Sequence, residues 1–224
     1  MKLPKTIAID GPAASGKSTL AEKLADSLGY LLFDTGVMYR AVTLAALDTL
    51  HAVNNEQEVT SLAQRVQIDV QPPTKDDGRK YDVLLNGEDV TRKIRTPEVD
   101  ANVSHVSAYP GVRRAMTTQQ RRIGQRGEVV MVGRDIGTVV LPEAELKIYL
   151  DASVEERARR RFEEVRLRGE TQSYPEILAS MRRRDQIDST RAVAPLRPAS
   201  DAVIINSDEL NVEQVLQMVV NMFD

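Results

Sequence analysis

Short apolar runs alternate with longer segments of helical periodicity along most of the chain. This alternation is typical of a parallel sheet with crossover helices. Helices are predicted over residues 17–28, where Gly29 supplies the stop signal, and from about 37 to 50. The runs that read as buried strands are residues 6–9, 30–33, 129–132, 146–150 and 202–205. The pattern therefore predicts an α/β fold.

Residues 67 to 94 have a different pattern. Residues 67–70 and 81–85 alternate as strands do, and the turn-rich residues 72–78 separate them. This predicts a small antiparallel insert. Helical patterning returns around 97–106 and after Pro110. Three later helix starts have capping-box spacing: Ser153 with Glu156, Ser173 with Glu176, and Asn211 with Gln214.

Composition excludes several classes of protein. The 224 residues suit one core domain with an inserted subdomain. Thirty Lys and Arg against 33 Asp and Glu, with no Trp and 4% aromatics, argue against a nucleic-acid binder. The absence of Cys excludes a disulfide scaffold, a thiolate zinc site and a cysteine nucleophile. No apolar stretch approaches the ~20 residues that span a bilayer. We expect a cytoplasmic monomer with no membrane partner.

The strongest motif follows the first predicted strand and opens the first predicted helix. Residues 11–19 fit the pattern G-x-x-x-x-G-K-[ST], in which backbone N–H groups bind phosphate oxygens. Lys17 is expected to bridge the outer phosphates, and the Ser18 hydroxyl to bind Mg²⁺. The alternative is a chance match in a strand–turn–helix joint. The predicted ATP site comprises Gly11, Pro12, Ala13, Ala14, Ser15, Gly16, Lys17, Ser18 and Thr19.

A GTPase is disfavoured by the sequence. The chain has no Asn-Lys-x-Asp motif for reading guanine. Its one D-x-x-G spelling, at residues 26–29, lies inside the first predicted helix, where it cannot serve as a switch.

Residues 151–200 contain eleven Arg and no Lys, which favours bidentate contact with phosphate over simple solvation. Arg157 and Arg161 are i,i+4 neighbours, and neither has an acidic residue at that spacing. Because like charges stacked on a helix repel, we predict that this pair clamps phosphate. A solvated face explains three further arginines through the pairs Glu155–Arg159, Glu156–Arg160 and Glu164–Arg168. Arg182, Arg183 and Arg184, with Asp185, Asp188 and Arg191, form either a second phosphate site or a structural ion-pair network.

Several segments together resemble the bacterial cytidylate kinase family, which belongs to the nucleoside monophosphate kinases. Ile9-Asp10-Gly11-Pro12 opens the phosphate loop as in that family, and residues 34–40 match its D-[ST]-G-x-x-Y-R segment. Further matching segments are 87–90, 94–99, Gly133-Arg134-Asp135-Ile136-Gly137-Thr138 and Arg191-Ala192-Val193-Ala194-Pro195-Leu196.

The resemblance implies a P-loop kinase fold with a five-stranded parallel sheet flanked by helices, a small antiparallel β insert and a helical lid. We divide the chain accordingly. Residues 1–36, 128–152 and 173–224 form the core. Residues 37–127 form the monophosphate-binding region with its insert at about 66–96, and residues 153–172 form the lid.

The resemblance also implies the reaction of ATP with CMP or dCMP, giving ADP and CDP or dCDP with Mg²⁺ in pyrimidine nucleotide metabolism, and slower use of UMP. By motif position, Arg40, Arg134 and Arg191 hold the acceptor phosphate. Ser104, Arg113 and Asp135 read cytosine, and Arg184 and Asp188 contact the sugar. Thr35 and Tyr39 complete the CMP site. The predicted catalytic residues are Lys17, Arg134, Asp135, Arg157, Arg161 and Arg191.

One departure from the family pattern concerns the metal. Val132 precedes Gly133 where an acidic residue is expected, which leaves Asp10 and Asp135 as the carboxylates near the loop. The Mg²⁺ shell is therefore expected to rely on Ser18 and water. His51 and His105 read as structural residues.

Two alternatives stay open. One is a sibling kinase for another acceptor, such as adenylate or shikimate, although the insert of about thirty residues and the Gly-Arg-Asp segment weigh against it. The other is a P-loop protein that binds nucleotide without turnover.

Overall fold

A five-stranded parallel sheet forms the centre of the computed structural model, which describes residues 3–167, 169 and 171–223. The strand order is β2-β6-β1-β7-β8, so the chain crosses the sheet between β1 and β2 and fills the gap later with β6. All four strand pairings are parallel, and Asp10 and Asp34 lie in register with Gly133 and Val132. The strands are β1 (Thr6–Asp10), β2 (Leu31–Asp34), β6 (Val129–Gly133), β7 (Leu146–Asp151) and β8 (Val203–Asn206). The predicted strands and the five-stranded sheet are confirmed.

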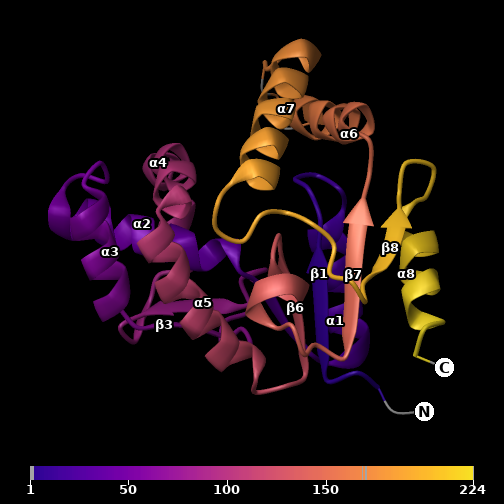
Figure 1. The fold of residues 1–224 in the computed structure, drawn as a ribbon, viewed down its shortest axis with the longest axis horizontal. Helices are drawn as coiled ribbons and strands as arrows, with labels where there is room; N and C mark the ends of the chain where they lie inside the picture. Colours follow the sequence, from indigo (N-terminus) through magenta and orange to yellow (C-terminus); the bar gives the residue numbers. More distant parts are fainter. Residues whose placement is uncertain (1–2, 168, 170, 224) are drawn as a thin grey trace.

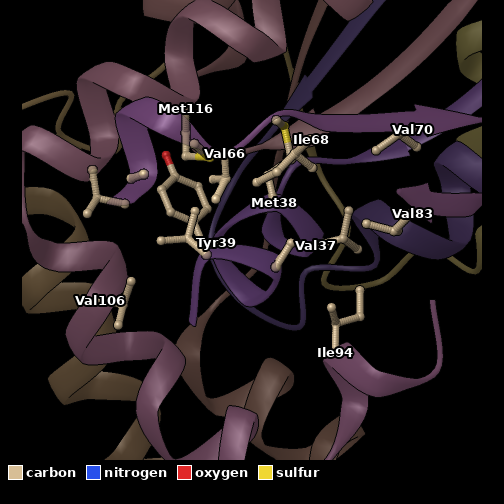
Figure 2. Packing of buried hydrophobic residues seen from close by; sticks show 14 of the residues in the cluster. Val37, Met38, Tyr39, Val66, Ile68, Val70, Val83, Ile94, Val106 and Met116 are labelled. Atoms are coloured by element: carbon tan, nitrogen blue, oxygen red, sulfur yellow. The ribbon is translucent and has the colours of Figure 1, made fainter. Parts of the chain in front are cut away.

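Helices cover both faces of the sheet because the side chains of buried parallel strands point alternately to either side. Ile7 and Ile9 face a cluster that contains α1 (Lys17–Leu28) and α8 (Val212–Val220). Ala8 and Met131 face a second cluster with α2 (Gly36–Leu50) and α5 (Pro110–Gly124). Figure 2 shows part of this second cluster, in which Tyr39 of α2 lies near Met116 of α5. The core thus fixes α2 and α5, which carry predicted acceptor residues.

The insert is a second, three-stranded antiparallel sheet in the order β3-β4-β5. Its strands are β3 (Ile68–Gln71), β4 (Asp82–Leu85) and β5 (Glu88–Asp89), followed by the 3₁₀ turn η1 (Lys93–Arg95) and α4 (Pro97–Ala108). The predicted antiparallel insert is confirmed, and β5 is an addition to it. A helix that the pattern analysis did not predict, α3 (Glu56–Arg65), precedes it. Asn55 caps this helix by accepting N–H bonds from Gln57 and Glu58.

The last third of the chain places two helices above the carboxyl end of β7 (Figure 1). These are α6 (Val154–Leu167) and α7 (Tyr174–Thr190), which pack through Ala158, Val165, Ile177 and Met181. The capping boxes at Ser173 and Asn211 are confirmed. The box at Ser153 is only half formed, because the Glu156 carboxylate turns away to Arg159 and Arg160. None of the helices in the described part of the chain is both long and apolar enough for a bilayer.

Candidate functional site

The phosphate loop lies between the carboxyl end of β1 and the start of α1, as its motif predicts. Gly11 has φ 146°, and a Cβ there would lie 2.1 Å from the Leu150 carbonyl oxygen. Gly16 has φ 94° and is the N-cap of α1. Glycine is needed at both positions because the backbone is left-handed or too close to β7 for a side chain. Ser18 is exposed at the start of α1, and the helix N-terminus favours an anion beside it.

Lys17 is buried at the base of this loop and donates to the Pro12 carbonyl oxygen at 2.5 Å. Burial, and next the charge of Arg134, lowers the pKa of Lys17 to about 7, although Asp34 and Asp10 act in the opposite direction. A buried ammonium that is so weakly compensated is well suited to phosphate oxygens.

Arg134 belongs to the loop that leaves β6, the strand next to β1. Its guanidinium forms an ion pair with Asp188 of α7, and Asp188 is also 3.5 Å from Arg191. Desolvation, and then the charge of Arg134, lowers the pKa of Arg184, with a smaller effect in the same direction from Arg40. Five basic residues therefore gather in a cationic cluster: Lys17, Arg40, Arg134, Arg184 and Arg191. The aspartates that lie near it are Asp10, Asp34, Asp100, Asp135, Asp185 and Asp188.

Asp135 is buried beside this cluster. Its carboxylate accepts from Arg113 at 3.0 Å and from Arg191 at 3.4 Å. The Arg113 guanidinium lies over the Tyr39 ring, 5.5 Å from its centroid, and its buried Nε has no hydrogen-bond partner among the described residues. The predicted residues Asp135, Arg113, Tyr39 and Arg191 are thus brought together, and Arg113 keeps one donor free.

Three predicted acceptor residues are arranged differently. Ser104 is exposed on α4, where its backbone carbonyl oxygen accepts from the Ser107 hydroxyl at 3.0 Å. In the described part of the chain, Arg113 and Asp135 bond each other and not the Ser104 hydroxyl. The Thr35 hydroxyl donates to the Val132 carbonyl oxygen at 2.9 Å, which ties β2 to β6. Arg40 donates to the Ile94 carbonyl at 3.1 Å and forms an ion pair with Asp100. Thr35 and Arg40 thus bond residues that hold the fold together, and Ser104 lies away from the Asp135–Arg113 pair.

Arg157 and Arg161 are not the unpaired charges that their helical spacing predicts, because both have acidic partners. Arg157 is buried and forms a bidentate pair with Asp185 of α7, at 2.6 and 3.1 Å. Arg161 pairs with Glu164 at 2.8 Å, three residues along instead of four. Spacing on one helix cannot reveal a partner on another helix. Arg157 nevertheless reaches the phosphate loop, because it donates to the Ala13 carbonyl at 3.2 Å.

The predicted ion pairs of the solvated helix face are also partly wrong. The pair Glu156–Arg160 is confirmed at 2.8 Å. Arg159 bonds Glu156 and Glu163 instead of Glu155, which pairs with Arg182. The pair Glu164–Arg168 lies partly outside the described residues.

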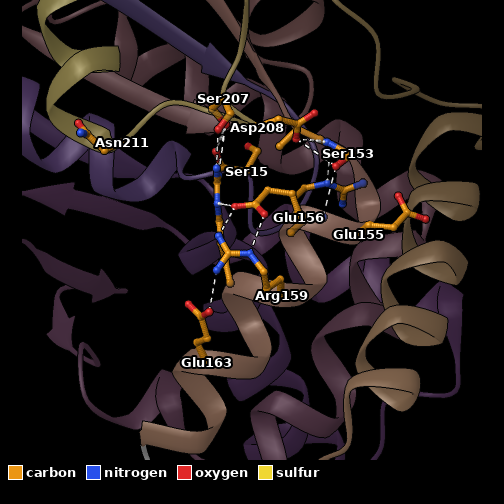
Figure 3. A network of polar contacts seen from close by, with 12 residues as sticks. Ser15, Ser153, Glu155, Glu156, Arg159, Glu163, Ser207, Asp208 and Asn211 are labelled. Carbon is orange, nitrogen blue, oxygen red and sulfur yellow. Dashed lines mark hydrogen bonds and ion pairs between the residues drawn. The ribbon is translucent and has the colours of Figure 1, made fainter.

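Arg159 borders a cavity of about 450 Å³ beside the phosphate loop, between α1, α6 and the segment after β8. Figure 3 shows the polar network at its edge. Glu156 binds Arg159 and Arg160, and Arg160 bonds the Ser207 hydroxyl at 3.2 Å. The Ser207 hydroxyl is also 3.3 Å from the Ser15 carbonyl oxygen. The apolar periodicity does not identify this region, although the polar run Asn206-Ser207-Asp208 at the carboxyl end of a strand is a recognisable signal.

The donor set for a metal is sparse. The described residues contain no group of three or more His, Cys, Asp or Glu able to hold an ion. Asp10 already accepts two backbone N–H bonds, and Asp34 accepts one from Gly36. The exposed Ser18 hydroxyl fits a Mg²⁺ ion that brings its own phosphate and water ligands.

Comparison with known proteins agrees with this geometry. The family model described as cytidylate kinase matches residues 7–224. The chain is 52% identical over 223 residues to the cytidylate kinase of Chloroflexus aggregans, covering 100% of this chain and 95% of that protein. It is 50% identical over 222 residues to the cytidylate kinase of Herpetosiphon aurantiacus, covering 99% and 95%. A crystal structure of an uncharacterized protein from Eubacterium ventriosum shares the fold, with a TM-score of 0.50, 13% identity and 97% coverage of each chain. The chain therefore belongs to the cytidylate kinase family.

Proposed function

We propose that this kinase transfers the γ-phosphoryl group of ATP to CMP or dCMP, giving ADP and CDP or dCDP, and that it uses UMP less well. The observation that carries this proposal is the buried Asp135–Arg113 pair beside the cationic cluster and the phosphate loop. The full-length similarity to proteins named cytidylate kinase supports it.

The donor nucleotide is proposed to lie along the phosphate loop. Residues 11–19 would hold its phosphates, and its base would enter the cavity bordered by Arg159, Ser207 and Asn211. Arg159 is suited to stack on a base because two carboxylates hold its planar guanidinium in place. The metal, held by Ser18, phosphate and water, would neutralise charge on the bridging phosphates.

The acceptor is proposed to lie between α2, α5 and α7. Arg40, Arg134 and Arg191 would hold its phosphate, and Arg184 and Asp188 its sugar. Thr35 and Tyr39 would line the site, and Ser104 would join the base reader when α4 approaches. Cytosine offers an amino donor beside acceptors, so it suits a carboxylate and a guanidinium better than uracil does.

The chemistry needs little from a general base, because a monophosphate oxygen is a nucleophile at neutral pH. Positioning the two phosphates and neutralising charge on the transferred group supply most of the catalysis. Lys17, Arg134, Arg157, Arg161 and Arg191 are proposed for this role. Residues 153–172 are proposed to close as a lid, which excludes water that would otherwise hydrolyse ATP.

An ADP-release assay with ATP and Mg²⁺ tests the proposal. Release that depends on CMP or dCMP, and is weaker with UMP, is the expected result. Release that depends on AMP or shikimate and not on CMP would identify a sibling kinase. Nucleotide binding without acceptor-dependent release would identify a binding protein.

A further inference from the structure

Asp10, the last residue of β1, connects the phosphate loop to the loop that carries Arg134 and Asp135. It is 4% exposed and directly precedes Gly11. Its two carboxylate oxygens accept N–H bonds from Ile136 at 2.8 Å and from Gly137 at 2.7 Å. These amides open the π-helical turn η2 (Ile136–Val140), which begins immediately after Asp135. One side chain of β1 thus satisfies both first amides of a turn that follows β6.

This contact determines what Asp135 is free to do. Asp135 occupies the N-cap position of η2, where an aspartate ordinarily binds the amides of its own helix. Its side chain makes no such cap bond and points instead to Arg113 and Arg191. Asp10 supplies the capping oxygens from outside the turn. Asp135 therefore does not cap the turn that follows it.

Holding a carboxylate here has an electrostatic cost. Burial, and to a smaller extent the charge of Asp135, raises the pKa of Asp10 to about 6, while the two amide bonds and Lys17 act in the opposite direction. An asparagine of the same size would accept from one amide and present its own NH₂ group to the other. The site therefore distinguishes a carboxylate from a carboxamide of equal volume.

We infer that Asp10 is a positioning residue for acceptor recognition, which caps η2 in place of Asp135 and so leaves Asp135 and Arg134 directed at the acceptor nucleotide. The inference rests on the proposed function, since it assumes that CMP binds at Asp135. Asp10 itself touches neither substrate. Its effect should appear in acceptor binding more than in donor binding.

The first test is D10N, measured with CMP and ATP varied separately. A donor now opposes one amide of η2, so kcat/KM for CMP should fall about tenfold or more. D10N also removes a negative charge that supports the charged form of Lys17, so KM for ATP should rise as well, but by a clearly smaller factor. The matched control is D82N, at a buried aspartate of the insert that also accepts a backbone N–H bond, from Thr74 at 3.0 Å. D82N should not lower kcat/KM for CMP relative to its effect on KM for ATP. Equal losses for both substrates in D10N, or no loss, would overturn the inference.

A double-mutant cycle tests whether Asp10 acts through Asp135. In D10N/D135A the loss of CMP affinity should be clearly smaller than the product of the two single losses, because the capped residue is gone. If the loss of CMP affinity in D10N/D135A equals the product of the two single losses, Asp10 does not act through Asp135.

Hydrogen exchange in the unmodified protein covers the case in which D10N does not fold. CMP should slow exchange of the Ile136 and Gly137 amides more than ATP does. Equal protection by both nucleotides, or none by CMP, would count against the inference. Failure of the proposed function is distinguishable, because the unmodified protein would then show no CMP-dependent ADP release at all.

Discussion

Lys17 is a buried cation whose only close partners among the described residues are the Pro12 carbonyl oxygen and the Ser15 hydroxyl, at 2.5 and 3.5 Å. Lys17→Met keeps the length of the side chain but removes the charge that is proposed to face the transferred phosphoryl group. We expect a fall in kcat of about 100-fold or more. Steady-state kinetics with ATP and CMP measure it, and unchanged thermal unfolding would show that the variant folds. Turnover at the unmodified rate would contradict the assignment of the phosphate loop.

The same lysine predicts a proton linkage. Burial lowers the pKa of Lys17 to about 7 from its ordinary 10.5, so above pH 7 the free protein holds this lysine largely neutral. Phosphate oxygens favour the charged form and raise the pKa again. Binding of ATP between pH 7 and 10.5 should therefore take up protons, about half a proton near pH 7 and close to one in the middle of this window, and ATP affinity should fall as the pH rises through it.

Calorimetry in buffers of different ionisation enthalpy measures this uptake. Lys17→Met should abolish it. Proton release, or uptake that persists in that variant, would assign the linkage to another group.

Asp135 carries the prediction about base choice. With uracil, Asp135 would face an acceptor oxygen and Arg113 an N–H donor, and buried mismatches of this kind cost roughly 1–3 kcal/mol each. Asp135→Ala should lower kcat/KM for CMP more than for UMP, so their ratio should shrink by about tenfold. Kinetics with the two acceptors measure the ratio. If kcat/KM for CMP and kcat/KM for UMP fall by the same factor, Asp135 does not read the base.

At the scale of elements, α6 presents its arginines to three different surroundings. Arg157 reaches the phosphate loop and α7, Arg159 borders the cavity proposed for the donor base, and Arg161 pairs with Glu164. Helical spacing places these side chains around α6, but their roles depend on which neighbours lie there.

Arg159→Ala should raise KM for ATP several-fold, because it removes the planar group that borders the base cavity. KM for CMP should stay within about twofold. Arg182→Ala is the control, because it removes an exposed ion pair between α7 and Glu155 of α6. This substitution should change the free energy of unfolding by no more than about 0.5 kcal/mol. Equal effects of the two substitutions on KM for ATP would show that the cavity does not hold the donor base.

At the scale of the molecule, the proposed donor and acceptor sites lie on different elements at the carboxyl ends of the sheet strands. Each ligand should therefore stabilise the fold separately. ATP at about 100 times its Kd should add about 2.7 kcal/mol, which corresponds to a rise in Tm of roughly 5–10 °C. CMP alone should also raise Tm. In Lys17→Met, thermal unfolding should show that the ATP shift is lost and the CMP shift retained. Loss of both shifts would contradict two separable sites.

The strands, most helices and the phosphate loop could be predicted because their signals are local. Short apolar runs identify the core strands, and the glycines at 11 and 16 with Lys17 identify a phosphate loop, without knowledge of any distant residue. The helix at 56–65 was missed, although Asn55 with Val59 and Leu62 carries its signal. The resemblance to a family placed Asp135 and Arg113 together as readers of the base and Arg191 with the residues that hold the phosphate, which periodicity alone does not do.

By itself the sequence determined the order of elements, the antiparallel insert and the chemistry of the phosphate loop, because each depends on residues within one short segment. Only the tertiary structure decided which charges meet. Asp185 reaches Arg157 from another helix, and Asp10 caps a turn 126 residues away. Such pairings depend on how strands and helices pack, and separation along the chain carries no information about distance across the folded protein.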